Sequence, residues 1–257
     1  MQIANIFPIA NQAYYKQEKV VMILAHLVSQ GLYDFTNFSK DQYVIMDNGA
    51  YEKSMVSNSL QDCIDIAESS GIKVNEIIIP DDFGNLAGTI QLFKDNYDTI
   101  IKYKDKYKFM FVAHNKNIDE LTKAFEFIDQ YSDLGNIVVG IPKCSGVSRN
   151  SNEAISLYKM YNLPIHFLGI VSTFDEIVNV KNIIRSCDTS QVSYMTKNLL
   201  ILDQIDKDIL PSNLFVQFMR DDTIGPDVDL ANDVLSNKRL EKVLYWEKEA
   251  FKEYGIL

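Results

Sequence analysis

Short apolar runs alternate with stretches of helical spacing along the first three quarters of the chain. The runs have the length and composition of buried strands, and they cover residues 3–9, 20–27, 43–47, 76–80, 108–113, 136–141, 164–170 and 183–188. The helical stretches between them cover residues 60–69, 89–103, 118–131, 152–161 and 173–182. Strands that alternate with helices in this way predict a (β/α)8 TIM barrel. The continuous apolar runs fit parallel strands that are covered on both faces.

The pattern changes after residue 190. The chain is less regular at first, and residues 229–254 are then rich in Leu, Lys and Glu at helical spacing. We predict a single domain over residues 1–257, with the barrel at about 3–190 and a C-terminal helical extension at about 191–257. No internal repeat of 20–50 residues suggests another architecture.

Composition and charge limit the classes of function. Hydrophobic residues make up 47% of the chain and charged residues 23%, as in ordinary globular domains, and the formal net charge is −10. This balance argues against a strongly basic nucleic-acid binder, although a local basic patch could still contact phosphates. The cationic side chains that we expect near phosphates are Lys143, Arg149, Lys181, Arg185 and Lys197.

The N-terminal region and the cysteines point to a cytoplasmic protein. The apolar run at residues 20–25 is too short to span a membrane, and no signal-peptide pattern precedes it. Cys63, Cys144 and Cys187 are far apart and lack metal-ligand or redox spacing. We therefore expect reduced thiols and no metal site.

Acidic residues follow several of the predicted strands. Asp47, Asp81 with Asp82, and Asp188 stand at the ends of the third, fourth and eighth runs, and His114 follows the fifth. Each has a simple alternative: Asp47 a turn, the other acids helix caps, and His114 a structural histidine. Function in a barrel gathers at the C-terminal ends of the strands, and buried carboxylates are costly without partners. The combination therefore favours a site.

Six segments resemble one family in order and spacing over about residues 3–190. The segment at residues 46–52, MDNGAYE, resembles the Asp-Ser-Gly-Gly-aromatic-Gln segment of tRNA-guanine transglycosylases, and more closely that of their phage and bacterial relatives that insert 7-deazaguanines into DNA. The other similar segments are LAHL at 24–27, IPDDFG at 79–84, VGIP at 139–142, HFLGI at 166–170 and SCDTS at 186–190.

This resemblance implies a base exchange at a glycosidic carbon. Asp188 would attack C1′ of a guanosine-type nucleotide and form a covalent intermediate, and Asp47 would be the general acid and base. Asp81 would accept hydrogen bonds from the base, and the backbone of Gly140 and Ile141 would contact the base carbonyl. The remaining expected substrate-binding residues are Asn48, Gly49, Asp82, His114 and Gly169. No cofactor is implied.

Two departures from the family affect the substrate. Residues 189–257 contain no Cys and no His, so the zinc site that follows the barrel of the tRNA enzymes is not expected here. This favours DNA as the partner, with tRNA as the alternative. His114 stands where the family usually has Gln, which leaves the accepted 7-deazaguanine base open.

Other readings of the same residues stay open. The chain could be a non-catalytic nucleic-acid-binding partner subunit of such an enzyme, or an unrelated sugar hydrolase that uses a carboxylate pair. The three acids argue against the first of these. We expect no membrane partner and a location in the cytoplasm, that of the host if a phage encodes the protein. The sequence leaves the oligomeric state open, a homodimer included.

Overall fold

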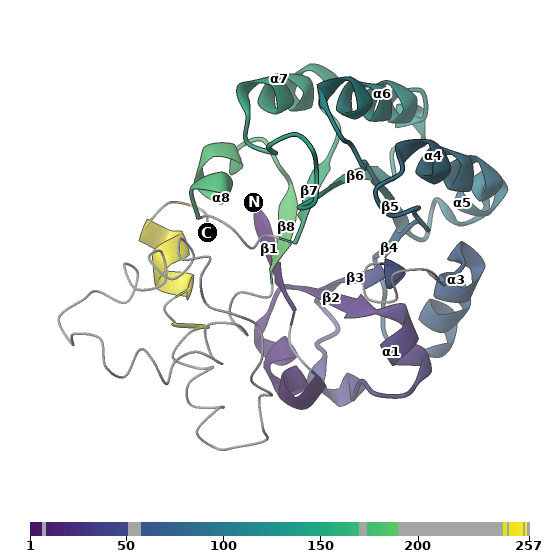
Figure 1. Cartoon of the computed structure of the whole chain (residues 1–257). Helices are drawn as coiled ribbons and strands as arrows, with labels where there is room; N and C mark the ends of the chain where they lie inside the picture. Colours follow the sequence, from purple (N-terminus) through teal and green to yellow (C-terminus); the bar gives the residue numbers. More distant parts are fainter. Residues whose placement is uncertain are drawn as a thin grey trace.

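The computed structural model describes residues 1–6, 9–50, 58–169, 174–189, 244–245, 247–253 and 255. Parallel strands close into a barrel in the order β1 to β8, and β8 pairs with β1 to complete the ring. Helices lie around the outside of this ring (Figure 1). The predicted (β/α)8 barrel is therefore confirmed.

The strands are short and lie close to the predicted runs. They are β1 (Gln2–Asn5), β2 (Val20–Leu24), β3 (Tyr43–Asp47), β4 (Glu76–Ile78), β5 (Lys108–Val112), β6 (Ile137–Pro142), β7 (Ile165–Leu168) and β8 (Ser186–Thr189). The α-helices are α1 (Ala25–Ser29), α3 (Leu60–Ser69), α4 (Leu86–Asp95), α5 (Tyr97–Tyr103), α6 (Ile118–Asp129), α7 (Asn152–Tyr161) and α8 (Phe174–Val180). Short 3-10 helices are η1 (Ile9–Gln17), η2 (Phe35–Asn37) and η3 (Ser132–Leu134).

Local sequence explains where the helices begin. The side chain of Ser59 accepts a hydrogen bond from the backbone of Asp62, and the Asp62 side chain accepts one from the backbone of Ser59, which forms a capping box before α3. Asn117 caps α6 in the same region of the helix, as the sequence predicted. The buried residues of α3, among them Leu60 and Ile64, then repeat at helical spacing and face the strands.

Three predicted boundaries are wrong. The apolar run at 20–27 is a strand only as far as Leu24, because α1 begins at Ala25. The run at 3–9 leaves the sheet after Asn5. The helix predicted at 89–103 is two helices, since Asn96 adopts φ −99° and ψ 4° and separates α4 from α5.

Side chains along each strand alternate between the barrel interior and the surrounding helices. The interior is filled by one apolar cluster, which includes Ala4, Met22, Ile45 and Met110. The opposite faces of the strands pack on the helices in a larger core cluster. By the same alternation, Asp47 on β3 and both Ser186 and Asp188 on β8 belong to the interior face.

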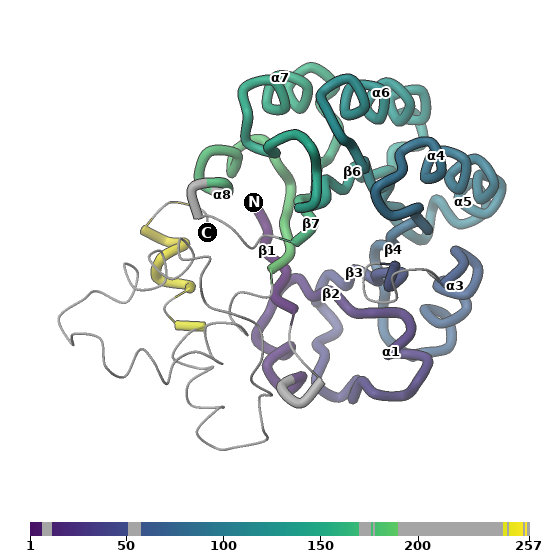
Figure 2. The backbone as a smooth tube through the Cα atoms, in the orientation of Figure 1, coloured from purple at the N-terminus to yellow at the C-terminus, as the bar shows by residue number. Residues whose placement is uncertain are grey.

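The C-terminal part of the chain returns to the first strand. Residues 244–245 and 247–253 are helical, and Leu244, Ala250 and Phe251 belong to the same core cluster as the barrel. Asn5 on β1 donates a hydrogen bond from Nδ2 to Glu247 Oε2 at 2.9 Å. This helical segment and β1 lie on the same side of the barrel (Figure 2). The predicted helices at 229–243 fall outside the described residues.

Within the described part of the chain, no helix is long and apolar enough to cross a membrane.

Candidate active site at the barrel mouth

Asp188 is held in one orientation at the C-terminal end of β8. Its Oδ1 and Oδ2 each lie 3.0 Å from the backbone nitrogen of Gly169, and His166 Nε2 lies 3.0 Å from Oδ1. The Asp188 side chain is 5% exposed and His166 is fully buried. Backbone N–H groups that donate to a carboxylate stabilise its ionised form. Asp188 is therefore a placed anion within β8, and the helix-cap alternative is wrong.

A buried arginine fixes the loop that supplies the Gly169 donor. Arg149 donates to the carbonyl oxygens of Ile141, Leu168 and Gly169 at 3.2, 2.7 and 3.3 Å. Its guanidinium also pairs with both carboxylate oxygens of Glu176, at 2.8 and 3.1 Å. These contacts join the ends of β6 and β7 to α8. Gly169 itself has φ +64°, a conformation that glycine adopts without strain.

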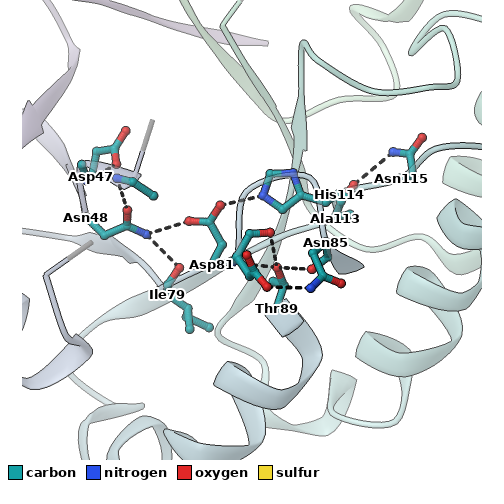
Figure 3. A network of polar contacts seen from close by, with 12 residues as sticks. Asp47, Asn48, Ile79, Asp81, Asn85, Thr89, Ala113, His114 and Asn115 are labelled. Carbon is teal, nitrogen blue, oxygen red and sulfur yellow. Dashed lines mark hydrogen bonds and ion pairs between the residues drawn. The ribbon is translucent and has the colours of Figure 1, made fainter. Parts of the chain in front are cut away.

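A second network joins the ends of β3, β4 and β5 (Figure 3). Asn48 Nδ2 donates to Asp81 Oδ1 at 3.0 Å and to the Ile79 carbonyl at 3.0 Å. His114 Nε2 lies 2.6 Å from Asp81 Oδ2. Because a carboxylate only accepts, Nε2 carries the proton in this pair. Asp47 Oδ1 accepts the Gly49 N–H at 2.8 Å, so Asp47 and Asn48 bracket the turn that the sequence predicted.

The closed strand order places the two networks opposite each other. β4 stands four strands from β8 in either direction around the ring, so the Asp81 network faces Asp188 across the mouth, meaning the C-terminal ends of the strands. Asp47 on β3 lies beside the Asp81 network. The structure thus brings the predicted acids to one end of the barrel, in two separately hydrogen-bonded groups.

The other predicted site residues have more local partners. Asp82 Oδ2 accepts from Asn85 Nδ2 at 2.6 Å, and Asn85, not Asp82, caps α4. The Gly140 carbonyl accepts the Ala113 N–H at 2.8 Å, and a side chain at Gly140 would collide with Met110 Sδ in the interior. The Ile141 carbonyl is bonded to Arg149. A side chain at Gly49 would lie 2.7 Å from His26 Nδ1, so this turn requires glycine.

The expected phosphate contacts are wrong for three of the cationic residues. Arg149 is 2% exposed and occupied by Glu176. Arg185 immediately precedes β8 and Lys181 follows α8, so both lie at the end of the barrel away from the mouth. Lys143 is exposed after β6, at the mouth. Lys197 lies outside the described residues.

Sequence reasoning missed a polar chain inside the barrel. Arg185 donates from both terminal nitrogens to Glu76, at 2.7 and 3.0 Å, and from Nε to Ser186 Oγ at 3.1 Å. Ser186 Oγ lies 2.8 Å from His166 Nδ1, which connects the ion pair to the site. The available sequence signal was the period of two on β8, which gives Ser186 and Asp188 a common face.

The described residues contain no group of three His, Cys, Asp or Glu side chains that could hold a metal ion. Cys63 and Cys187 are buried free thiols and Cys144 is an exposed one. Burial, followed by the charge of Asp188, raises the pKa of the Cys187 thiol, which keeps this thiol protonated.

No protein-family description and no curated protein matches the chain. Its fold is similar to dihydrodipicolinate synthase from Thermotoga maritima, at 14% identity and a TM-score of 0.45, over 100% of this chain and 99% of that one. It is also similar to a HpcH/HpaI aldolase/citrate lyase family protein from Burkholderia cenocepacia, at 7% identity and a TM-score of 0.48, over 79% and 92% of the two chains.

A third similar structure is the carboxyl transferase domain of Rhizobium etli pyruvate carboxylase, at 10% identity and a TM-score of 0.49, over 99% of this chain and 47% of that one. None of these three is described as a transglycosylase. Likenesses this distant carry over no activity, so the function has to be argued from the residues at the mouth.

Proposed function

We propose that this protein is an enzyme, a transglycosylase that exchanges guanine in DNA for a 7-deazaguanine base through a covalent Asp188 intermediate. The observation that carries the proposal is the Asp188 carboxylate, which is buried, held by Gly169 and His166, and placed across the mouth from Asp81. A nucleophile on one side and hydrogen-bonding groups for a base on the other suit base exchange.

The reaction would have two steps. An Asp188 oxygen forms a bond to C1′ of the nucleotide, and the bond from C1′ to the guanine nitrogen breaks with its electron pair on guanine. Asp47 gives a proton to the departing guanine. The incoming 7-deazaguanine then loses a proton to Asp47, its nitrogen bonds to C1′, and the bond to Asp188 breaks. Atoms and charges balance without a further reactant.

The base would lie against the Asp81 network. Each Asp81 oxygen already accepts one hydrogen bond, from Asn48 or from His114, and has capacity to accept another from a base N–H. His114 Nδ1 is not bonded to any residue of the described chain, so it could contact a base carbonyl or amine. A target base in a duplex would have to leave its stack, at about a few kcal/mol.

The first test measures exchange directly. Purified protein would be incubated with radiolabelled guanine and a guanine-containing DNA oligonucleotide, with tRNA as a parallel substrate. Label in DNA is the expected result. Label in tRNA alone would replace DNA by tRNA as the substrate, and no label in either would refute the reaction. Mass spectrometry of nucleosides from host DNA, with a 7-deazaguanine supply, would identify the inserted base.

The second test separates the two acids. Asp188→Asn should abolish exchange and the covalent adduct on a denaturing gel, because an amide cannot attack C1′. Asp47→Asn should slow exchange by about 10²- to 10⁴-fold and still allow an adduct to accumulate. Asp133→Asn is the matched control, since Asp133 is exposed in the loop before β6, away from the mouth. Exchange retained by Asp188→Asn would exclude Asp188 as the nucleophile.

A further inference from the structure

The carboxylate of Asp188 is the end of a continuous hydrogen-bonded chain through the barrel interior. The chain begins at the ion pair of Arg185 with Glu76, whose carboxylate is fully buried and also accepts the Tyr43 hydroxyl at 2.6 Å. It continues through Ser186 Oγ to His166 and ends at Asp188. Glu76 is on β4 and Arg185 precedes β8, so the ion pair bridges opposite sides of the barrel.

Donor and acceptor capacities fix the direction of each hydrogen bond. Arg185 Nε–H can only donate, so it occupies a lone pair of Ser186 Oγ. The single hydroxyl hydrogen of Ser186 is then directed to His166 Nδ1, which accepts it. Nε2 carries the ring proton and donates it to Asp188 Oδ1, which can only accept as a carboxylate.

We propose that His166 is a positioning residue that orients the Asp188 carboxylate as its Nε2–H tautomer, and that Ser186, Arg185 and Glu76 maintain this tautomer from the opposite end of the barrel. A neutral imidazole in this state has no proton to give up to Asp188 without losing its own hydrogen bond. The carboxylate therefore stays ionised, with its plane fixed by His166 and the Gly169 N–H.

The direct test is nitrogen NMR of the imidazole rings. The sequence contains only three histidines, so histidine labelled with ¹⁵N on the ring gives three ring systems, which His26→Gln and His114→Gln variants assign. We expect His166 to show a protonated Nε2 and an unprotonated, hydrogen-bonded Nδ1. A His166 ring protonated at Nδ1 would overturn the inference. This measurement needs neither substrate nor activity.

Two variants test the remote part of the chain. Ser186→Ala removes the donor to Nδ1, and Arg185→Lys retains a positive charge beside Glu76 but lacks the Nε–H that orients the hydroxyl. Both should move the Nδ1 resonance toward that of a nitrogen without a hydrogen bond, with the Nε2 proton retained. An unchanged Nδ1 resonance in both variants would overturn the role of the barrel interior. Thermal unfolding would confirm that each variant is folded.

The activity test rests on the proposed function. His166→Leu removes the donor to Asp188 and should lower kcat for exchange by about 10- to 100-fold with little change in KM, the size of one hydrogen bond to a charged group. His166→Gln supplies an amide donor and should recover most of the loss. Equal losses in both variants would argue against positioning. Absence of exchange in the wild type would refute the proposed function alone, because the NMR result would still decide the tautomer.

Discussion

The contact between Glu247 and the barrel should make stability depend on pH. Glu247 is 2% exposed, and its Oε2 accepts from Asn5 Nδ2, which also lies 3.4 Å from Glu18 Oε2. Burial, and then repulsion from Glu18, raises the pKa of Glu247 from 4.5 to about 8. We predict that Glu247→Gln, which removes the titrating group and retains the shape of the side chain, will flatten the stability profile above neutral pH.

The sign and size follow from linkage. A carboxyl group with a raised folded-state pKa binds more protons in the folded than in the unfolded protein, so its stabilisation is complete below pH 4.5 and is lost as pH rises through 8. Each pKa unit corresponds to about 1.4 kcal/mol, so the wild type should lose about 3 kcal/mol between pH 6 and pH 9 relative to Glu247→Gln. Burial also raises the pKa of Glu18, which acts in the same direction.

Urea unfolding at pH 6, 7, 8 and 9 measures this difference. The single tryptophan of the chain, Trp246, precedes Glu247 in the sequence and supplies the fluorescence. Glu249→Gln is the control, because the Glu249 side chain is 39% exposed and pairs with Lys252 on the surface. Its profile should follow the wild type. Parallel profiles for Glu247→Gln and the wild type would refute the reasoning.

Three further changes test the supports of the site. Arg149→Met leaves Glu176 buried without its partner and should cost about 3–5 kcal/mol of unfolding free energy in urea; a loss below 1 kcal/mol would contradict a buried ion pair. Gly169→Ala and its control Gly135→Ala both introduce a side chain at positive φ and should each cost about 1–2 kcal/mol, but only Gly169→Ala should reduce exchange. Purified protein should contain no stoichiometric zinc by elemental analysis, since Cys63, Cys144 and Cys187 are on separate segments; one zinc per chain would refute this.

Periodicity was sufficient for the strands and for much of the site's location. The run at 43–47 is β3 without adjustment, and the parallel-strand pattern was enough to place Asp47 and Asp188 at one end of the barrel. The division between α4 and α5 was missed because Asn96, a tolerable helix residue, leaves helical geometry in this context. Local pattern does not report such tertiary effects.

The partners of the site residues could not be predicted. Glu76 reads as the polar first residue of a strand, and only the closed ring brings it to Arg185 on the opposite side. Arg149 reads as a surface cation in a loop, yet it is buried against three carbonyls. Such contacts depend on pairs that are distant in sequence, so neither spacing nor composition encodes them visibly.

Closure of the ring also bears on how the chain folds during synthesis. Ile3 pairs with Cys187 across the β1–β8 seam, so the first strand made must wait for the last before its second edge is hydrogen-bonded. Contacts of such high sequence separation form slowly. Until residues 186–189 leave the ribosome, β1 has an exposed edge of the kind that pairs with other chains, and the nascent barrel would be a natural client for chaperones.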